Sequence, residues 1–483
     1  MAAQAHKATD LRVLKSSGFR AYLATLFLGA FNDNLFKLLL ICFALNLLTR
    51  EQQNNYVPLA TALFTLPYIL FSSYAGFLAD RFSKRTVMIV SKAAEIAIMG
   101  CGYYFFRIQA ATPLLFVLFA MGAQSAFFGP AKYGFLPEVL PDKALSRGNG
   151  AVQLATFLAI ILGGAVAGHL ATKYIEMPAA ARVEQPAIAG EAVSSSDAPA
   201  PTTAALSQKD PKVSAAATAA GTTREAPEQS GAAKQPTQVH RAAIHCVVIA
   251  VIGFITSLLI MPTPPGHRDA VFTWNPLSTH WQTLHAMRRD RLLILCLLGN
   301  CYFWFMGVLF QSNLPLLVKN DIGASDQTVG ILLAAVALGI GIGSSAAGFL
   351  SRGKIEYGLV LPGGLLVALF AIILGVFGRW LAPAAICVSL MGFCSGFFQL
   401  PLVTSIQKRS PADQRGQFMG AVNAVDCLGM LLAAVFHWLL IKPLGLSASA
   451  VFVVLGLLTL GVLMMMSKNA PSLLARAKQL LKP

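Results

Sequence analysis

Charged residues are scarce in this sequence. They make up 12% of its 483 residues, about half of the roughly 25% that is usual in soluble domains. Hydrophobic residues account for 56%, and the mean hydropathy is +0.64. A water-soluble fold of this length could not hide so much apolar surface. The composition therefore excludes an ordinary soluble protein and predicts a membrane protein.

Disulfide and metal patterns are also missing. The eight cysteines lie in apolar runs and form no CxxC pair and no metal-ligand spacing. This pattern is typical of small buried side chains, so we expect no disulfide framework, no metal and no cofactor. The first 20 residues lack the apolar core and small-residue cleavage site of a signal peptide. We therefore expect the first membrane span to insert directly.

Long apolar runs are what the sequence does contain. A helix of about 20 apolar residues crosses the ~30 Å hydrocarbon core of a bilayer. The sequence predicts an all-α membrane protein of twelve such helices, whose even number places both termini on one side. The predicted spans are 21–48, 58–79, 87–106, 113–130, 150–172, 242–261, 292–313, 327–350, 358–378, 383–404, 419–440 and 448–466.

The distribution of basic residues indicates the orientation. If the N-terminus is cytoplasmic, 23 of the 37 lysines and arginines fall in cytoplasmic segments and five in the short external loops. Basic residues collect in the cytoplasmic loops of membrane proteins. The net charge of +16 is therefore interpreted as membrane topology rather than as affinity for nucleic acid. Both termini are predicted to be cytoplasmic.

One segment has a different composition. Residues 177–240 are rich in alanine, proline, serine and threonine and contain no aromatic residue. Such a segment cannot bury enough apolar area to offset its chain entropy, so we predict a disordered external loop. The sequence leaves open whether this insert has a function. The insert belongs to a predicted N-terminal half, 1–261. Three further parts are predicted after it: a cytoplasmic linker with an amphipathic helix, 262–291, a C-terminal half, 292–466, and a basic cytoplasmic tail, 467–483.

Short matches recur between the two halves. "SAFF" at 125–128 returns as "SGFF" at 395–398, and "GAVQ" at 150–153 returns as "GAVN" at 420–423; two further matches share almost the same offset, 270 to 272 residues. Each match falls on the corresponding span of the other half. The repeat predicts two pseudo-symmetric six-helix halves in parallel. This is the architecture of major facilitator transporters, whose substrate site lies at mid-membrane between the halves.

The stretch "GFLADRFSKR" at 76–85 resembles the major facilitator signature between helices two and three. Gly76 allows close helix packing, and Asp80 can lie at a helix N-terminus, where the helix dipole favours an anion. The resemblance implies a conformational latch of Gly76, Asp80, Arg81 and Arg85 that holds the halves in one access state. Ordinary cytoplasmic basic charge would explain the arginines but not Gly76 and Asp80.

Longer stretches point to a narrower family. Four stretches resemble bacterial lysophospholipid transporters: "LFLGAFNDNLFK", "FFGPAKYGFLPEVLP", "WNPLSTHWQTLHAMRRDRLLIL" and "LLGNCYFWFMGVLFQSNLPLLVK". The likeness is closest to the transporter half of fused proteins that also carry a lysophospholipid acyltransferase and an acyl-carrier-protein ligase, and it covers about 11–466 except the insert.

This resemblance implies a secondary transporter rather than an enzyme. It would move lysophospholipids from the outer to the inner leaflet of the bacterial inner membrane by alternating access, supplying their reacylation. The chain stops at Pro483 without the fused enzyme domains, so a separate acyltransferase is a candidate partner beside the membrane lipids. We expect a monomer.

Charged and amide residues interrupt the first span. A charge at the bilayer centre costs about 2.5–3.5 kcal/mol on insertion scales, so such residues pair or face a cavity. Asp33 and Lys37 are four apart with the acid first, the better order for a helix pair, and Asn32 and Asn34 flank the acid. The resemblance implies that this stretch lines the cavity. All four are candidate substrate-binding residues, and Asp33 is also a candidate for charge coupling; a purely structural bond is the alternative.

Three further spans carry ionisable residues. Lys92 and Glu95 form an acid–base pair three apart, a candidate for charge coupling, although a structural pair is favoured. Lys132, in a motif shared with the family, could bind a substrate phosphate or reach for the interface. Asp426 replaces Thr156 of the first-half repeat, which makes it a candidate proton carrier or, equally, a buried paired group. The remaining candidate substrate-binding residues are Asn300, Gln311, Gln399 and Asn423.

Two other functions stay open at this point. One is proton-coupled export of an amphiphilic drug or siderophore, with Asp33 or Asp426 as the proton carrier. The other is a non-transporting membrane anchor that docks an acyltransferase on the inner face.

Overall fold

The computed structural model describes residues 11–175, 238–263 and 274–480. The chain divides into two compact units, residues 1–175 with 237–483 and residues 176–236. The second unit, and with it most of the predicted disordered loop at 177–240, lies outside the described residues. At the end of the predicted loop, a helix begins at Val239.

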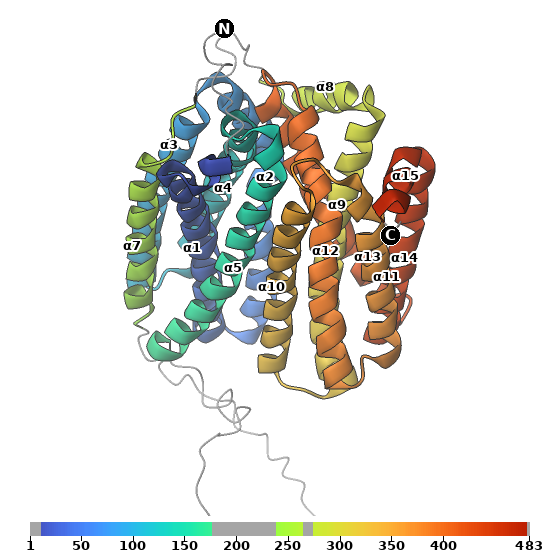
Figure 1. The fold of residues 1–483 in the computed structure, drawn as a ribbon. Helices are drawn as coiled ribbons and strands as arrows, with labels where there is room; N and C mark the ends of the chain where they lie inside the picture. The colour runs from blue at the N-terminus through green and yellow to red at the C-terminus, as the bar shows by residue number, and fades with distance from the viewer. Residues whose placement is uncertain (1–10, 176–237, 264–273, 481–483) are drawn as a thin grey trace, which may run out of the picture. The chain divides into compact units, whose positions relative to one another are not determined.

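The described part of the first unit consists of helices and the short turns between them (Figure 1). The helices are η1 (Leu11–Lys15), α1 (Ser17–Leu47), α2 (Arg50–Arg81), α3 (Lys84–Arg107), α4 (Ala111–Val139), α5 (Asp142–Tyr174), α7 (Val239–Leu258), α8 (Pro276–Arg288), α9 (Arg291–Leu316), η2 (Leu317–Ile322), α10 (Asp326–Leu350), η3 (Tyr357–Leu359), α11 (Val360–Phe377), α12 (Leu381–Arg409), α13 (Arg415–Ile441), α14 (Ala448–Asn469) and α15 (Pro471–Leu480).

Twelve helices of the described segments are long and apolar enough to cross a membrane. They correspond one to one to the twelve predicted spans, which confirms the all-α membrane fold class. Several are longer than predicted. Helix α4 continues through Pro130 and Pro137 to Val139, so Lys132 lies inside this helix and not just beyond its end.

Polar residues explain where several of these apolar helices begin. Thr49 and Gln52 form a capping box at the start of α2, and Asp290 accepts hydrogen bonds from the first backbone N–H groups of α9. Ser447 does the same at the start of α14. Each cap satisfies backbone donors that have no partner within the helix.

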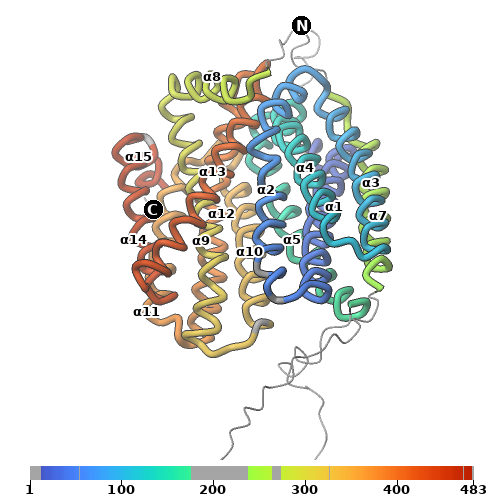
Figure 2. Tube along the Cα trace, turned by 180° about the vertical axis from the view of Figure 1, so that it is seen from behind, coloured from blue at the N-terminus to red at the C-terminus, as the bar shows by residue number. Residues whose placement is uncertain are grey.

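The membrane helices form two groups of six, which we call the first half (α1–α5 and α7) and the second half (α9–α14). Helix α5 packs against α10, and α2 packs against α13, so these four helices join the halves (Figures 1 and 2). Helix α8 lies across the helix ends where α9 begins (Figure 1). We call this the linker end, and the opposite end, where α1 finishes, the insert end.

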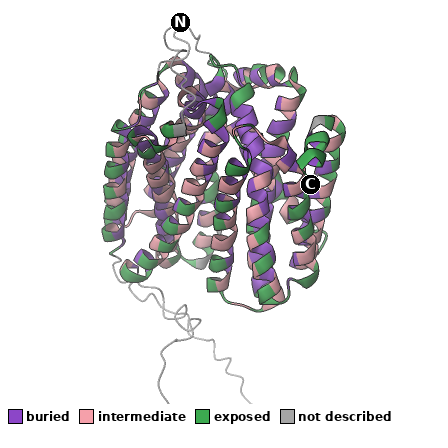
Figure 3. Ribbon diagram, in the orientation of Figure 1, coloured by how far each residue is buried: buried purple, intermediate pink, exposed green. Residues whose placement is uncertain are grey.

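Buried apolar residues form separate clusters in the two halves. One large cluster lies in the second half and includes Phe303, Phe398 and Phe452. Two others lie in the first half, around Phe36 and Phe106 and around Tyr22. Figure 3 shows the exposed residues on the outer faces of the helices. Each half therefore has an apolar core of its own, and Tyr133 and Phe157 of the first half also pack against the core of the second.

Candidate functional site

The carboxylate of Asp80, near the end of α2, caps a helix of the second half. Its Oδ1 accepts a hydrogen bond from the backbone N–H of Gly416 at 2.5 Å, and its Oδ2 accepts one from Gln417 at 2.8 Å. These two N–H groups belong to the first turn of α13, where the helix dipole favours an anion. The helix N-terminus expected beside Asp80 is thus that of α13, and the contact joins the two halves at the linker end.

Gly76 allows α2 to approach α13 this closely. A Cβ atom at Gly76 would lie 2.7 Å from the carbonyl oxygen of Gly416, which no side chain could tolerate without moving a helix. The fully buried Lys84 stands behind Asp80. Its Nζ lies 2.7 Å from a carboxylate oxygen of Glu138 on α4 and 3.9 Å from Asp80. Lys84 and Glu138 therefore support the capping carboxylate from within the first half.

The two arginines of the predicted latch make different contacts. The guanidinium of Arg81 lies 6.0 Å from the ring centre of Phe77 on the same helix. The Nη2 of Arg85 donates to the carbonyl oxygen of Leu258, at the end of α7, at 2.6 Å. Both contacts stay within the first half, whereas those of Gly76 and Asp80 cross to the second. The sequence interpretation missed Lys84 as the buried cation of this motif.

Helices α5 and α10 make the corresponding contact on the other side. A Cβ atom at Gly348 would lie 2.8 Å from the carbonyl oxygen of Ser146, and the Ser146 hydroxyl donates to the carbonyl oxygen of Lys354 at 3.3 Å. Nearby, the side-chain amides of Asn149 and Gln407 exchange two hydrogen bonds, of 2.7 and 3.0 Å. A second set of contacts between the halves thus lies at the linker end.

Asp33 and Lys37, expected to form a pair, have different partners. The Ser125 hydroxyl on α4 donates to Asp33 Oδ2 at 2.8 Å. The ammonium of Lys37 lies 5.3 Å from the ring centre of Phe64 on α2. Both side chains are half-buried. The acid and the base therefore share one face of α1 without bonding to each other.

Lys132 is a further lysine within the membrane spans of the first half. Its Nζ donates to the hydroxyl of Thr156 on α5 at 3.4 Å and lies 4.9 Å from the ring centre of Tyr133. Because α4 continues as a helix at this point, the side chain is held among other helices and is half-buried. Lys132 is therefore not part of a loop at the membrane–water interface.

Lys92 and Glu95 form a closed buried pair. Lys92 Nζ lies 2.6 Å from Glu95 Oε2, and the Asn32 amide donates to Glu95 Oε1 at 2.8 Å. All three residues are buried, and the bonds link α3 to α1. Asn34 points elsewhere, because its amide donates to the Ala30 carbonyl oxygen of its own helix at 2.7 Å. This geometry matches the structural interpretation of the Lys92–Glu95 pair.

A chain of amides runs from Asp426 into the first half. The Asn300 amide donates to Asp426 Oδ2 at 2.8 Å, and the Gln399 amide donates to the side-chain Oδ1 of Asn300 at 3.4 Å. Gln399 in turn accepts a hydrogen bond from Gln153 on α5. Within the described residues, the buried Oδ1 of Asp426 has no hydrogen-bond partner. Within the described residues, one of the two carboxylate oxygens of Asp426 is thus hydrogen-bonded, and its network joins the two halves.

The last two candidates differ in position. Asn423 is half-buried on α13, and its amide nitrogen would lie 2.7 Å from a Cβ atom at Gly129 of α4, so it faces the first half. Gln311 is exposed and lies outside the Asp426 network. The sequence interpretation missed Ser125 and Gln153, although both fall on the internal repeat: Gln153 corresponds to Asn423 at the offset of 270 residues.

Comparison with characterised proteins identifies relatives of the whole chain. Lysophospholipid transporter LplT of Escherichia coli O6:K15:H31 (strain 536 / UPEC) is 27% identical over 457 residues, which cover 91% of this chain and 94% of the relative. Lysophospholipid transporter LplT of Escherichia coli O1:K1 / APEC is 26% identical over the same length.

Solved structures share the fold. The transporter FucP in the outward conformation superposes with a TM-score of 0.69 at 14% identity, covering 94% of this chain and 99% of FucP. The human organic anion transporter MFSD10 gives a TM-score of 0.65 at 14% identity, covering 93% and 99%. The family model described as Major Facilitator Superfamily matches residues 22–181, 242–434 and 297–475. The chain therefore belongs to the major facilitator superfamily and is a secondary transporter rather than an enzyme.

Proposed function

We propose that this multi-pass inner-membrane transporter moves lysophospholipids from the outer to the inner leaflet by alternating access. The similarity to transporters named for lysophospholipids, over 91% of the chain, supports this substrate class. The product of such transport, a lysophospholipid in the inner leaflet, is the substrate that an acyltransferase needs.

One structural observation carries the proposal. The first half holds half-buried charges of both signs, Asp33, Lys37 and Lys132, within its membrane spans. Among the described residues, none of the three forms an ion pair, in contrast to the closed Lys92–Glu95 pair. A zwitterionic headgroup such as phosphoethanolamine presents an ammonium and a phosphate, and it needs a carboxylate and a lysine in return.

The contacts between the halves support alternating access. Three contacts between the halves lie toward the linker end: the capping of α13 by Asp80, the close approach of Gly348 to α5, and the hydrogen bonds between the Asn149 and Gln407 amides. The second part of α12 is buried on almost every side, from Phe398 to Gln407 (Figure 3). If the linker end is cytoplasmic, as the basic residues predict, this arrangement is the state closed toward the cytoplasm.

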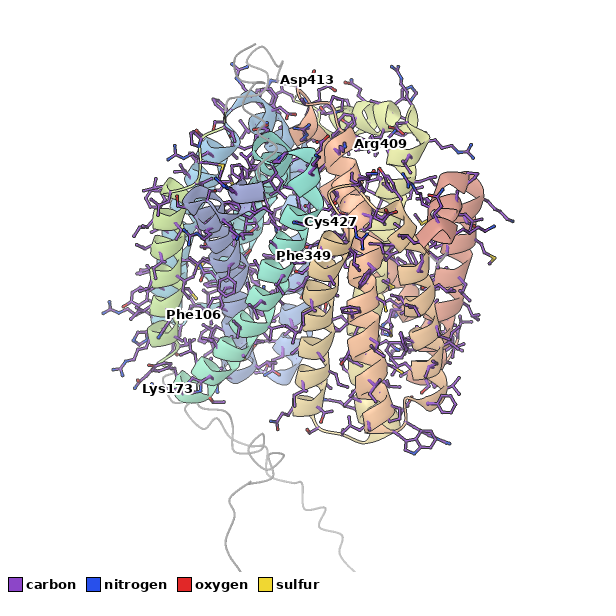
Figure 4. The ribbon with its side chains drawn as sticks, in the orientation of Figure 1. Phe106, Lys173, Phe349, Arg409, Asp413 and Cys427 are labelled. Atoms are coloured by element: carbon purple, nitrogen blue, oxygen red, sulfur yellow. The ribbon has the colours of Figure 1, made fainter. Side chains whose placement is uncertain are left out.

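Uptake of labelled lysophosphatidylethanolamine by spheroplasts tests the proposal. The host should lack its own lysophospholipid transporter and express the full chain. We expect the Asp33→Asn variant to lose at least tenfold in uptake rate, because the amide keeps the shape but removes the charge that binds the headgroup ammonium. Asp413→Asn is the matched control, because Asp413 is exposed at the linker end (Figure 4). Uptake by the unaltered chain no faster than by the empty host would contradict the proposal.

Asp426 favours a second candidate, proton-coupled export of an amphiphile. Its buried Oδ1 is free of hydrogen bonds within the described residues, and an ionisable group inside a membrane span is a candidate proton carrier. In that case cells that express the Asp426→Asn variant would be more sensitive to the drug than cells that express the unaltered chain. Neither the variant nor the unaltered chain would take up lysophospholipid. Binding of a purified acyltransferase without any transport would instead support the anchor function. The expected monomer is tested separately, by size-exclusion chromatography with light scattering.

A further inference from the structure

Two aromatic rings of α2 stand beside the acid and the base of α1. The ring centres of Phe64 and Tyr68, one turn apart on α2, are 6.0 Å apart in an edge-to-face arrangement. The ammonium of Lys37 lies 5.3 Å from the centre of the Phe64 ring. This is within the distance of about 6 Å at which a cation is attracted to an aromatic face. The Phe64 ring therefore already holds a primary ammonium group.

The two rings face the interior of the helix bundle and not the lipid. Helix α2 is a membrane span, and its exposed residues include Leu59, Leu66 and Leu70. At about 3.6 residues per turn, these three positions lie on one side of the helix. Phe64 and Tyr68 lie on the opposite side, and both are half-buried. A group bound to the Phe64 ring would therefore be held between helices.

Helix α4 places the Phe64 ring near the carboxylate of Asp33. A Cβ atom at Gly122 of α4 would collide with the carbonyl oxygen of Phe64, so the two backbones touch at this point. Ser125, three residues further along α4, lies on the same face as Gly122 and donates to Asp33. The Tyr68 hydroxyl is also within electrostatic reach of Asp33 and Ser125. The rings and the acid thus form one cluster between α1, α2 and α4.

The Phe64 ring lies on the insert-end side of Asp33. Helix α1 runs toward the insert end, so Lys37 is one turn nearer to that end than Asp33. The contacts of Asp80 with α13 join the halves at the opposite, linker end. The basic residues predict that the insert end is external. A substrate that enters from the outer leaflet would therefore meet Lys37 and Phe64 before it reaches Asp33.

The chemistry of an ethanolamine headgroup matches this arrangement. Phosphoethanolamine carries a primary ammonium group, which is the group that Lys37 places on Phe64. An aromatic face and a carboxylate both attract such a cation. Lys37 has a flexible four-carbon stem, so its ammonium can leave the ring for a phosphate. A phosphoglycerol headgroup has no ammonium group that could replace Lys37 on the ring.

We infer that the Phe64 ring binds the ammonium group of a lysophospholipid headgroup in exchange for the ammonium of Lys37, which then pairs with the phosphate. The inference rests on the proposed function and deepens it. It makes Phe64 the residue that selects an ethanolamine headgroup over a glycerol headgroup. The edge of the Tyr68 ring holds Phe64 in place for this exchange.

Competition binding to the purified full chain in detergent tests this inference. Tritiated lysophosphatidylethanolamine is displaced by unlabelled lysophosphatidylethanolamine or by lysophosphatidylglycerol with the same acyl chain. The ratio of the two inhibition constants does not depend on the fraction of protein that is folded. We expect the unaltered chain to prefer the ethanolamine lipid at least fivefold. The Phe64→Leu variant should lose this preference, and Phe64→Tyr, which keeps an aromatic face, should retain it.

A matched variant on the same helix is the control. Phe71 is also half-buried, but its ring stacks on that of Phe127 of α4 at 5.9 Å. Phe71→Leu removes an aromatic ring from α2 and should leave the headgroup preference unchanged. An unchanged preference in Phe64→Leu, loss of the preference in Phe71→Leu or Phe64→Tyr, or equal binding of the two lipids by the unaltered chain would overturn the inference.

Uptake by spheroplasts that express the same proteins separates this inference from the proposed function. Uptake by the unaltered chain together with an unchanged binding preference in Phe64→Leu would refute the role of the ring alone. A preference that depends on Phe64, without any uptake, would refute the proposed transport and leave the ammonium site established. Failure of the purified unaltered chain to bind lysophosphatidylethanolamine would overturn the inference whatever the uptake.

Discussion

At the scale of single residues, the charged groups inside the spans are of two kinds. Lys92 and Glu95 neutralise each other at 2.6 Å in a buried position. Among the residues that the structure describes, the partner of Asp33 is the Ser125 hydroxyl, and that of Lys37 is the aromatic ring of Phe64. The first kind links α1 to α3 through buried bonds, and we propose that the second binds the headgroup of the substrate.

The buried pair leads to a stability prediction. Lys92→Met leaves the Glu95 charge without its partner, which costs about 3–5 kcal/mol of folding free energy for a buried pair. We expect a clearly lower melting temperature of the purified protein in detergent. The double variant Lys92→Met/Glu95→Leu should recover most of the loss, because replacing both partners by apolar groups is often neutral. A double variant no more stable than the single one would argue against a structural pair.

Lys132 leads to a prediction on affinity. A hydrogen bond to a charged group contributes about 1.5–3 kcal/mol, so Lys132→Gln should raise KM for lysophosphatidylethanolamine uptake roughly tenfold or more. Lys442→Gln is the control, because Lys442 is exposed just beyond α13 at the insert end. Unchanged KM in the Lys132 variant would mean that this lysine only anchors α4 to α5.

At the scale of helices, close approach between α2 and α13 controls the linker end. Gly76 and the capping carboxylate of Asp80 act on the same two residues of α13. The contact needs a glycine and an acid four residues apart on one helix, opposite the first turn of another. This is the physical reason for the pattern within the signature motif.

Gly76→Leu should therefore open the linker end. The new side chain meets the Gly416 backbone, where a Cβ atom alone would lie at 2.7 Å. Spin labels at Lys143 and Asp413, both exposed, should report a longer distance by electron resonance. Gly100→Leu is the control, because a Cβ atom at Gly100 would meet nothing within 4 Å. Identical distance distributions in the two variants would show that this packing does not hold the halves together.

At the scale of the whole molecule, each half has its own apolar core, and small and polar residues join the halves at the linker end. Tyr133 and Phe157 of the first half add apolar contacts to the second core. Such an interface has two sets of equivalent contacts, α2 with α13 and α5 with α10. This property is what a rocking motion about a mid-membrane site requires.

The orientation of the whole molecule gives the last prediction. The excess of basic residues near the linker end predicts that this end is cytoplasmic. In a cysteine-free background, Lys442→Cys should react with a membrane-impermeant maleimide on intact spheroplasts, and Lys478→Cys should react only after lysis. Both lysines are exposed. The reverse pattern would invert the proposed direction of transport.

Much of the fold could be predicted from the sequence. All twelve spans were predicted because apolar length alone makes a membrane helix. The end of α4 was not, because the predicted span stops at residue 130, whereas the helix continues through Pro130 and Pro137 to Val139. Neighbouring helices can sustain a membrane helix across proline. The roles of the candidate site residues stay predictions. Asp33, Asn300, Gln399 and Asp426 do lie at polar contacts, whereas Gln311 is exposed and Ser125 and Gln153 were missed.

The sequence by itself determined the membrane class, the number of spans, the twofold repeat and the residue types that carry charge into the bilayer. These properties depend on composition and on order along the chain. The tertiary structure alone decided which groups are partners: Asp80 with α13, Glu95 with Asn32, and Asp33 with Ser125 rather than with Lys37. Spacing along one helix places two side chains on the same face, but the helix packed against that face decides what each of them contacts.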